Sequence, residues 1–430
     1  MQSRIVETSL ERGRLGNLLH VTKWIVSKRT GLIVSSLLVI TALFIHAGEI
    51  VTLSVAVTWS DYEIRLTTDI EFDGIPAIIQ ASNREIWIFW SKYEVGNYEI
   101  FYTTSFDEGD TWSPETPLTT NSSDNTGVSV FQASNGAIWV VWASNRFGNY
   151  EIFYKTSFDL GTSWSNDTQL TFHPDHDLGP AIYQLSNGTI WVVWASNRSG
   201  GHDLYLKASS DGGASWSDDT RLTEDPNFDK SPSIVQTSDD RIWVVWGSDK
   251  TGNSDIYCMI YNGSQWLEET QLTSGPNVDT NPHILQTLNG ELWIFYSQRL
   301  PTDLATDDIY YMYSSDNGVN WSGDIQFTTD PYDDMWSSMI QTRDTRIWVV
   351  WTSDRDSQPD WGNWDIYYRR SLVGDVNGDG AVDILDLSII GMAYGAHEGD
   401  PHYNSDADLN KDGFVDLRDL AFVTRNFGST

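Results

Sequence analysis

The sequence predicts an all-β six-bladed propeller followed by a small α domain, and two observations carry this prediction. The first is the segment PAIIQASNREIWIFW at residues 76–90, because six related copies of it follow one another along the chain. The second is a pair of similar acidic segments that begin 33 residues apart near the C-terminus. Each copy of the first segment has a glutamine at the same place: Gln80, Gln132, Gln184, Gln236, Gln286 and Gln341. The successive spacings between these glutamines are 52, 52, 52, 50 and 55 residues. A period of this length indicates a repeat architecture.

Each repeat unit contains four short strand-like stretches and no helical period. The first is the P-x-I-x-Q stretch, and a turn leads to the second, an I-W-V-V-W stretch of β-branched and aromatic residues. The third resembles residues 151–155 (EIFYK), and the fourth ends in Leu-Thr, as at residues 118–119. Four strands in each of six units is the make-up of a six-bladed propeller.

The two ends of the repeat region complement each other. The last unit stops after its third strand, at residues 365–370. Residues 58–67 match residues 111–119, which supply the fourth strand of a complete unit. We therefore expect residues 50–371 to form a ring that the N-terminal strand closes, which removes free sheet edges.

Residues 1–47 have the features of a signal peptide or an N-terminal membrane anchor. Basic residues such as Arg4, Arg12 and Arg29 precede an uncharged apolar run at residues 31–47, and Ala47 is a suitable cleavage point. The run is about as long as the shortest spanning helix, so an uncleaved anchor is the alternative. Because basic residues precede the run, the rest of the chain is expected outside the cell or on its surface.

Composition excludes some classes of function. The net charge of −34 argues against nucleic acid as a partner, because a polyanion would be repelled. The single cysteine, Cys258, cannot form an intrachain disulfide. In an exported protein a metal ion is then expected to supply the cross-linking that disulfides often provide.

Two family resemblances occur inside the repeat units. Four segments between the third and fourth strands resemble the Asp-box, S-x-D-x-G-x-x-W, of bacterial neuraminidases: residues 105–112, 157–164, 209–216 and 314–321. In that family the box is a structural turn, in which the Asp ties the loop, the Gly allows a positive φ and the Trp packs between strands. Residues 143–154 and 247–258 resemble the repeats of TolB-type propellers.

The neuraminidase resemblance implies an arginine cluster for a substrate carboxylate, a Tyr-Glu pair and an acid/base Asp. The first of those arginines lies in an R-I-P motif, and the tripeptide at that place here is Gly74-Ile75-Pro76. We therefore assign no catalytic residue and expect no sialidase activity. A sialidase-like glycoside hydrolase that acts on polysaccharide is the alternative interpretation.

Repeated polar residues form a candidate ligand face at one mouth of the predicted channel. One set precedes the first strand of each unit: Asp73, Asn125, Asp177, Asp229, Asp279 and Asp334. Another lies in the loop before the third strand: Arg146, Arg198, Lys250, Arg299 and Arg355. Since active sites usually break blade symmetry whereas interblade ion pairs repeat, a scaffold role is favoured over ligand binding, and ligand binding over catalysis.

The two acidic segments have the pattern of calcium loops. Residues 375–386 (DVNGDGAVDILD) and 408–419 (DLNKDGFVDLRD) place oxygen ligands at loop positions 1, 3, 5, 7, 9 and 12. We expect two calcium ions. The predicted ligands are Asp375, Asn377, Asp379, Ala381, Asp383 and Asp386 in the first loop, and Asp408, Asn410, Asp412, Phe414, Asp416 and Asp419 in the second.

Helix-like stretches follow the loops at residues 387–394 and 420–426, but only three residues separate the first loop from the propeller, so no entering helix fits. Paired loops of this kind resemble dockerin type I repeats, which places a dockerin-like domain at residues 372–430. That resemblance implies a cohesin-like protein partner. The positions that read the partner in that family are Ile384, Leu385, Leu417 and Arg418, and their mostly apolar character suits a buried interface.

These observations lead to one hypothesis and two alternatives. The hypothesis is an exported assembly protein with a calcium-dependent dockerin-like domain and a propeller that displays a carbohydrate-binding or protein-binding surface. The alternatives are the glycoside hydrolase and a purely structural surface-layer component. Two carboxylates on a blade face that breaks the symmetry would favour an enzyme, whereas an aromatic groove would favour binding.

Overall fold

The computed structural model describes residues 57–60, 63–301, 306–356, 363–377, 381–404, 406–409 and 413–427. The predicted signal or anchor segment lies outside the described residues, as do the predicted ligands Asp379, Asn410 and Asp412. Within the described part of the chain, no helix is long and apolar enough to cross a membrane.

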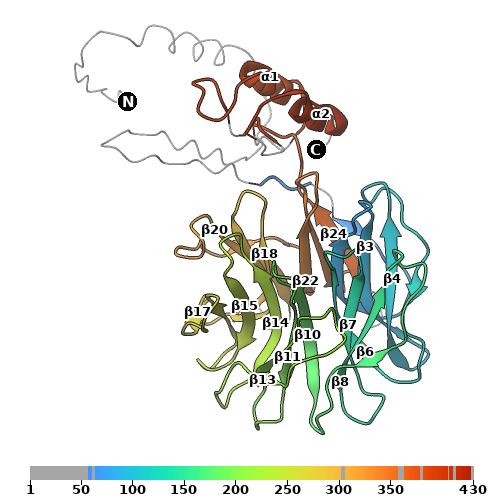
Figure 1. Cartoon of the computed structure of the whole chain (residues 1–430). Coiled ribbons are helices and arrows are strands. Elements are labelled where there is room, and N and C mark those ends of the chain that lie inside the picture. Colours follow the sequence, from blue (N-terminus) through green and yellow to red (C-terminus); the bar gives the residue numbers. More distant parts are fainter. Residues whose placement is uncertain are drawn as a thin grey trace, which may run out of the picture. The chain divides into compact units, whose positions relative to one another are not determined.

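Six four-stranded antiparallel sheets stand side by side around a common axis (Figure 1). Blade 1 contains β2 (Asp73–Gln80), β3 (Ile86–Glu94), β4 (Asn97–Ser105) and β5 (Thr116–Pro117). Blade 2 contains β6 (Asn125–Gln132), β7 (Ile138–Ser144), β8 (Glu151–Ser157) and β9 (Thr168–Gln169). Blade 3 contains β10 (Asp177–Gln184), β11 (Ile190–Ser196), β12 (Asp203–Ser209) and β13 (Thr220–Arg221).

The other three blades repeat this order. Blade 4 contains β14 (Asp229–Gln236), β15 (Ile242–Ser248), β16 (Asp255–Tyr261) and β17 (Thr270–Gln271). Blade 5 contains β18 (Val278–Gln286), β19 (Leu292–Arg299), β20 (Asp307–Ser314) and β21 (Ile325–Gln326). Blade 6 contains β22 (Asp334–Gln341), β23 (Ile347–Ser353), β24 (Asp365–Arg370) and, from the start of the chain, β1 (Ile64–Arg65). The predicted six-bladed all-β architecture is confirmed.

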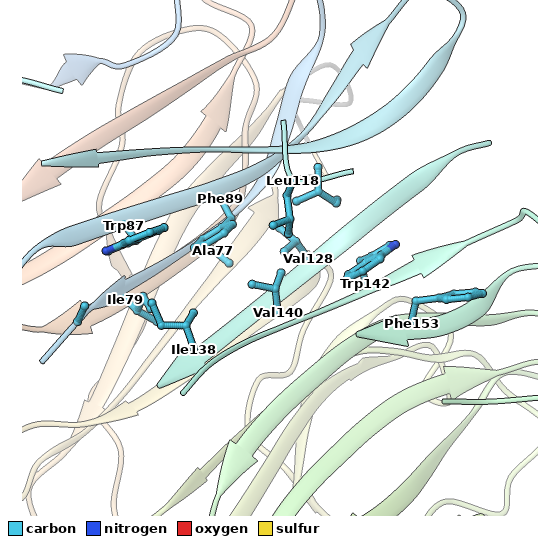
Figure 2. Packing of buried hydrophobic residues seen from close by; sticks show 12 residues of the cluster. Ala77, Ile79, Trp87, Phe89, Leu118, Val128, Ile138, Val140, Trp142 and Phe153 are labelled. Atoms are coloured by element: carbon cyan, nitrogen blue, oxygen red, sulfur yellow. The ribbon is translucent and has the colours of Figure 1, made fainter. Parts of the chain in front are cut away.

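The core lies between neighbouring blades, because the second strand of each blade is buried on both faces. Figure 2 shows the contact of blades 1 and 2, where Trp87 and Phe89 of β3 face Ile138 and Val140 of β7. Trp142 of the same cluster is fully buried. Strands covered on both sides need continuous apolar runs, which explains the I-W-V-V-W stretches.

The Asp-box turns pack against the preceding blade. In blade 1, Asp107 accepts hydrogen bonds from the hydroxyl and the N–H of Thr111, and these lower the pKa of Asp107 to about 2. In blade 2, the ring of Trp164 meets that of Trp87 edge-on at 6.5 Å. A Cβ on Gly161 would lie 2.2 Å from the Trp87 ring, at a φ of +77°. The box is therefore a structural turn whose glycine admits the neighbouring tryptophan.

Replacing this glycine should destabilise the propeller. We expect Gly161→Ala to lower the free energy of unfolding by about 2–4 kcal/mol, since it combines an unfavourable φ with overpacking against Trp87. Gly136→Ala is the matched control, because Gly136 has a φ of +89° and no heavy atom within 4 Å of its Cβ position. Thermal unfolding of both variants separates the two causes, and equal losses would show that Trp87 does not constrain the turn.

The ring closes through the N-terminal strand. Ile64 and Arg65 pair antiparallel with Tyr368 and Tyr367 of β24. Trp59 takes the place of an Asp-box tryptophan, with its ring 4.8 Å from that of Phe327. Blade 6 thus gains its fourth strand from the other end of the chain, as the sequence match predicts.

The C-terminal domain has two helices, α1 (Ile384–Ala393) and α2 (Leu417–Asn426), around a small core that includes Val382, Ile390 and Val423. The prediction that they begin at residues 387 and 420 is wrong. Asp383 and Asp416 cap them inside the acidic loops, and Asp386 and Asp419 complete the capping boxes. The helices therefore start three residues earlier, at the tenth position of each loop.

Candidate functional sites

The six innermost strands line a central channel with a cavity volume of about 710 Å³. At one end, here called the mouth, each strand has a register shift. The residue inside each shift has a positive φ: Ile75, Gly127, Gly179, Ser231, Asn281 and Trp336. At the opposite end lie the six glutamines that reveal the period in the sequence.

These glutamines join every blade to the next. The side-chain oxygen of Gln132 accepts a hydrogen bond from the backbone N–H of Ser82 at 2.7 Å, and its amide donates to the carbonyl of Gly136. The same interblade bond recurs in the other blades, and Gln80 closes the circle by accepting from the N–H of Arg343 at 2.9 Å. The glutamines at this end of the channel therefore have a structural role, since they link the blades.

The aspartate and asparagine residues that precede the first strand of each blade are buried, with side chains turned into the blades. Asp73, Asn125, Asp177, Asp229, Asp279 and Asp334 are each at most 2% exposed. Four of them accept a hydrogen bond from the indole N–H of their own second strand, such as Trp90 to Asp73 at 2.7 Å and Trp246 to Asp229 at 3.0 Å. Each such bond fixes the start of the first strand against the second.

The cationic set is held in ion pairs. Arg146 binds Asp167 at 2.6 Å, and Arg198 binds both Asp177 and Asp219. The remaining pairs are Lys250 with Asp225 and Glu269, Arg299 with Asp307, and Arg355 with Glu63, Asp330 and Asp334.

Two details of this network could not be read from the sequence. Glu151 is the first acidic residue after Arg146 in the chain, but it accepts hydrogen bonds from Thr171 and Asn149 instead. The actual partner, Asp167, comes from the segment before the fourth strand, which no spacing along one loop reveals. Blade 1 also has a cation that the sequence analysis missed, Lys92, which binds Asp69 and Glu115. Lys92 lies two residues after Trp90, whereas Arg146 lies four residues after Trp142. An alignment of the repeats therefore does not place Lys92 with the other cations.

The burial of Asp73 makes its charged form unfavourable. Burial raises the pKa of Asp73 to about 8, although the charge of Lys92 opposes this shift. Among described atoms, its second carboxylate oxygen is buried without a hydrogen-bond partner. The folded protein therefore holds this proton more tightly than the unfolded chain, and the contribution of Asp73 to stability falls as pH rises from about 4 to about 8.

The variant Asp73→Asn should remove this pH dependence, because Asn125 already fills the same position in blade 2 and accepts from Trp142 at 3.0 Å. Between pH 5 and pH 9, we expect the free energy of unfolding of the variant to rise by about 1–3 kcal/mol relative to that of the wild type. Chemical denaturation at both pH values measures this. Asp110→Asn, at an exposed acid, is the control, and parallel pH profiles for Asp73→Asn and the wild type would contradict the assignment.

The two acidic loops have the same internal geometry. Asp386 accepts from the N–H groups of Val376 at 2.7 Å, Asn377 at 3.1 Å and Asp383 at 2.8 Å. Asp419 accepts from Leu409 and Asp416, each at 2.8 Å. Each loop is thus folded around its twelfth residue.

The carboxylates of these loops fit a hard cation. Asp386 and Asp419 are fully buried, and Asp408 is 1% exposed. The hydrogen bonds to Asp386 come from backbone N–H groups, which do not neutralise its charge. Buried carboxylates need a counter-charge, and an all-oxygen donor set suits calcium. The other predicted ligands among the described residues are Asp375, Asn377, Ala381, Asp383, Asp408, Phe414 and Asp416.

A ring of six blades with Asp-box turns, joined to paired acidic loops, defines the class of the molecule: a sialidase-type propeller with an acidic-loop domain. The chain belongs to the family with the BNR repeat-like domain, whose model matches residues 52–279, just over half of the 430 residues. The dockerin type I domain matches residues 373–428. No curated protein matches the chain.

Solved structures of other proteins share the fold. A protein of unknown function from Dyadobacter fermentans is 15% identical with a TM-score of 0.61, and the match covers 73% of this chain and 98% of that one. The NanB sialidase from Streptococcus pneumoniae is 10% identical with a TM-score of 0.55, over 73% of this chain and 70% of that one. An α-L-arabinofuranosidase from Fusarium graminearum is 12% identical with a TM-score of 0.55, over 72% and 97%.

Proposed function

We propose that this chain is an exported, dockerin-bearing propeller that is anchored to a cohesin-type module in a calcium-dependent way, with two calcium ions per chain. The propeller then displays a binding surface for carbohydrate or protein. The dockerin type I match supports the first part, because dockerin domains bind cohesin modules and their proteins are usually secreted or cell-surface components.

The observation that carries the proposal is the exposure of apolar side chains where the loops meet the helices. Ile384, Leu385 and Leu417 are 65%, 52% and 67% exposed, although they stand in the first turn of α1 or α2. Arg418 lies beside Leu417 and binds Asp416 at 2.8 Å. Because the capping boxes that start these turns use loop carboxylates, metal binding would fix the presented surface.

Binding of the full-length chain to a panel of purified cohesin modules tests the proposal. We expect calcium-dependent binding that chelator abolishes and that the double variant Ile384→Asp/Leu417→Asp weakens at least tenfold. Phe106→Asp is the control, because Phe106 is 76% exposed on an Asp-box turn of the propeller. Calcium-independent binding, or undiminished binding of the double variant, would contradict the proposal.

A glycoside hydrolase remains the second candidate, since the fold is shared with a sialidase and an arabinofuranosidase. The geometry at Gly74 argues against a sialidase-type active site. A Cβ there would lie 2.5 Å from the ring of Phe72, so the arginine of the R-I-P motif does not fit without moving that ring.

We therefore expect no turnover of a fluorogenic sialoside by the purified chain. The cations around the mouth are already neutralised, and a bare carboxylate buried beside them would cost several kcal/mol. Turnover that Arg146→Ala or Arg198→Ala abolishes would reverse this order of preference and make hydrolysis the leading function.

A further inference from the structure

One side of the channel mouth breaks the six-fold symmetry with aromatic side chains. Phe72, Tyr98, Trp336 and Trp364, here called the aromatic patch, come from blades 6 and 1 and the segments that join them. Trp336 occupies the register-shift position, and the residues that occupy it in the other blades are all smaller: Ile75, Gly127, Gly179, Ser231 and Asn281. A feature that appears on one blade only is not explained by the scaffold that all blades share.

The four rings form one contiguous group. The centroid of Phe72 lies 5.6 Å from Tyr98, 6.4 Å from Trp336 and 6.3 Å from Trp364, and the two tryptophan rings are 6.1 Å apart. All four side chains are half-buried, and Trp336 borders the central channel. The patch therefore keeps aromatic surface open to solvent at the entrance of a cavity.

The backbone holds these rings in place. The carbonyl of Trp364 accepts from the N–H of Asp73 at 2.8 Å, and the N–H of Trp336 donates to Ser297 at 3.2 Å. The N–H of Tyr98 donates to Asp124 at 3.2 Å. A surface fixed in this way loses little conformational freedom when a ligand binds.

The positive φ of Trp336, +54°, recurs at the register shift of every blade and belongs to the scaffold, so only the size of its side chain is particular to blade 6. One further observation points to a ligand. The second-strand tryptophans of blades 1, 2, 4 and 6 donate their indole N–H to buried aspartate or asparagine side chains. In the part of the chain that the structure describes, the indole N–H groups of Trp336 and Trp364 have no such partner and are not buried.

We propose that the aromatic patch binds a neutral sugar chain. This inference rests on the proposed role of the propeller as a binding surface and names its ligand class. The negative faces of aromatic rings attract the polarised C–H face of a sugar, and the free indole N–H groups can donate to its hydroxyl oxygens.

Charge favours a neutral glycan over an anionic one. The six cations Lys92, Arg146, Arg198, Lys250, Arg299 and Arg355 are all held by carboxylates. Next to the patch, Asp124 accepts from Tyr98 and Tyr150, and Asp333, three residues before Trp336 in the chain, accepts from the N–H of Asp307. Carboxylates at this edge accept hydrogen bonds from sugar hydroxyls and repel a sugar acid.

The test uses the full-length chain with calcium and titrates neutral cello-, xylo-, manno- and arabino-oligosaccharides, with an oligogalacturonate as the anionic match. We expect at least one neutral oligosaccharide to bind and to change the tryptophan fluorescence. Trp336→Gly should weaken this binding at least tenfold while leaving the melting temperature unchanged or higher, because glycine suits the positive φ and blades 2 and 3 already use it. Trp364→Ala should weaken binding as well, whereas Phe106→Ala, on the turn between the third and fourth strands of blade 1, should not.

Cohesin binding, measured on the same samples, separates this inference from the proposed function. If Trp336→Gly loses the sugar and keeps cohesin, the inference stands. If cohesin binds but no neutral oligosaccharide does, the inference fails alone. Preference for the oligogalacturonate, sugar binding that survives both tryptophan variants, or a protein ligand that occupies the patch in place of sugar would also overturn it.

Discussion

Chelation of calcium is expected to unfold the domain of residues 373–428 and to leave the propeller folded. The loops bury Asp386, Asp408 and Asp419, and a buried carboxylate is costly unless a cation compensates its charge. Because metal binds the folded loops only, its binding free energy becomes folding free energy. At a calcium concentration one hundred times the dissociation constant, each site adds about 2.7 kcal/mol.

Calorimetry of the full-length chain measures this effect. We expect two thermal transitions with calcium, of which the chelator removes or lowers only the one that belongs to the small domain, and a titration that ends at two ions per chain. Asp386→Ala and Asp419→Ala should each abolish one site, whereas Asp400→Ala, outside both loops, should not. Absence of binding at millimolar calcium would show that the loops are acidic turns without metal.

Deletion of residues 51–67 is expected to destabilise the whole propeller rather than its N-terminus alone. The deletion removes β1 and the ion pair of Arg65 with Asp365 at 2.7 Å, and Asp365 is fully buried. It also removes Trp59, which packs on Phe327 and Trp293. A buried charge left without its partner costs about 3–5 kcal/mol, and the exposed sheet edge adds to this loss.

Circular dichroism during heating tests the deletion. We expect the transition of the propeller to stay cooperative and to move down by ten degrees or more, about what a loss of several kcal/mol produces in a domain of this size. Arg65→Met provides a graded comparison, because it removes the ion pair and keeps the strand, and its shift should be smaller. An unchanged melting temperature after the deletion would mean that the ring closes in another way.

The sequence predicted best those features that a physical constraint repeats along the chain. The glutamine period is visible because each glutamine must reach the neighbouring blade, and the Asp-box is visible because its glycine must admit a tryptophan such as Trp87. The dockerin type I domain is equally readable, because the spacing of its acidic residues is fixed.

Features that depend on contacts across the sheet were not predictable in the same way. The ion pair of Arg146 with Asp167 joins two segments of one blade, and no short-range spacing in the sequence predicts it. The start of α1 was misplaced because Asp386 serves both as a loop residue and in the capping box. The aromatic patch was missed because a search for repeats passes over residues that occur only once, such as Trp336.

The glutamine circle has a consequence for how this protein can diverge. On the neighbouring blade each glutamine oxygen binds a main-chain N–H, at Ser82, Ser134, Ser186, Ser238, Leu288 and Arg343. Any residue except proline offers that group, so the side chain at these six turns is free to be serine, leucine or arginine. Mutations can therefore accumulate on that rim and create new surface chemistry there, while the linkage between blades stays intact.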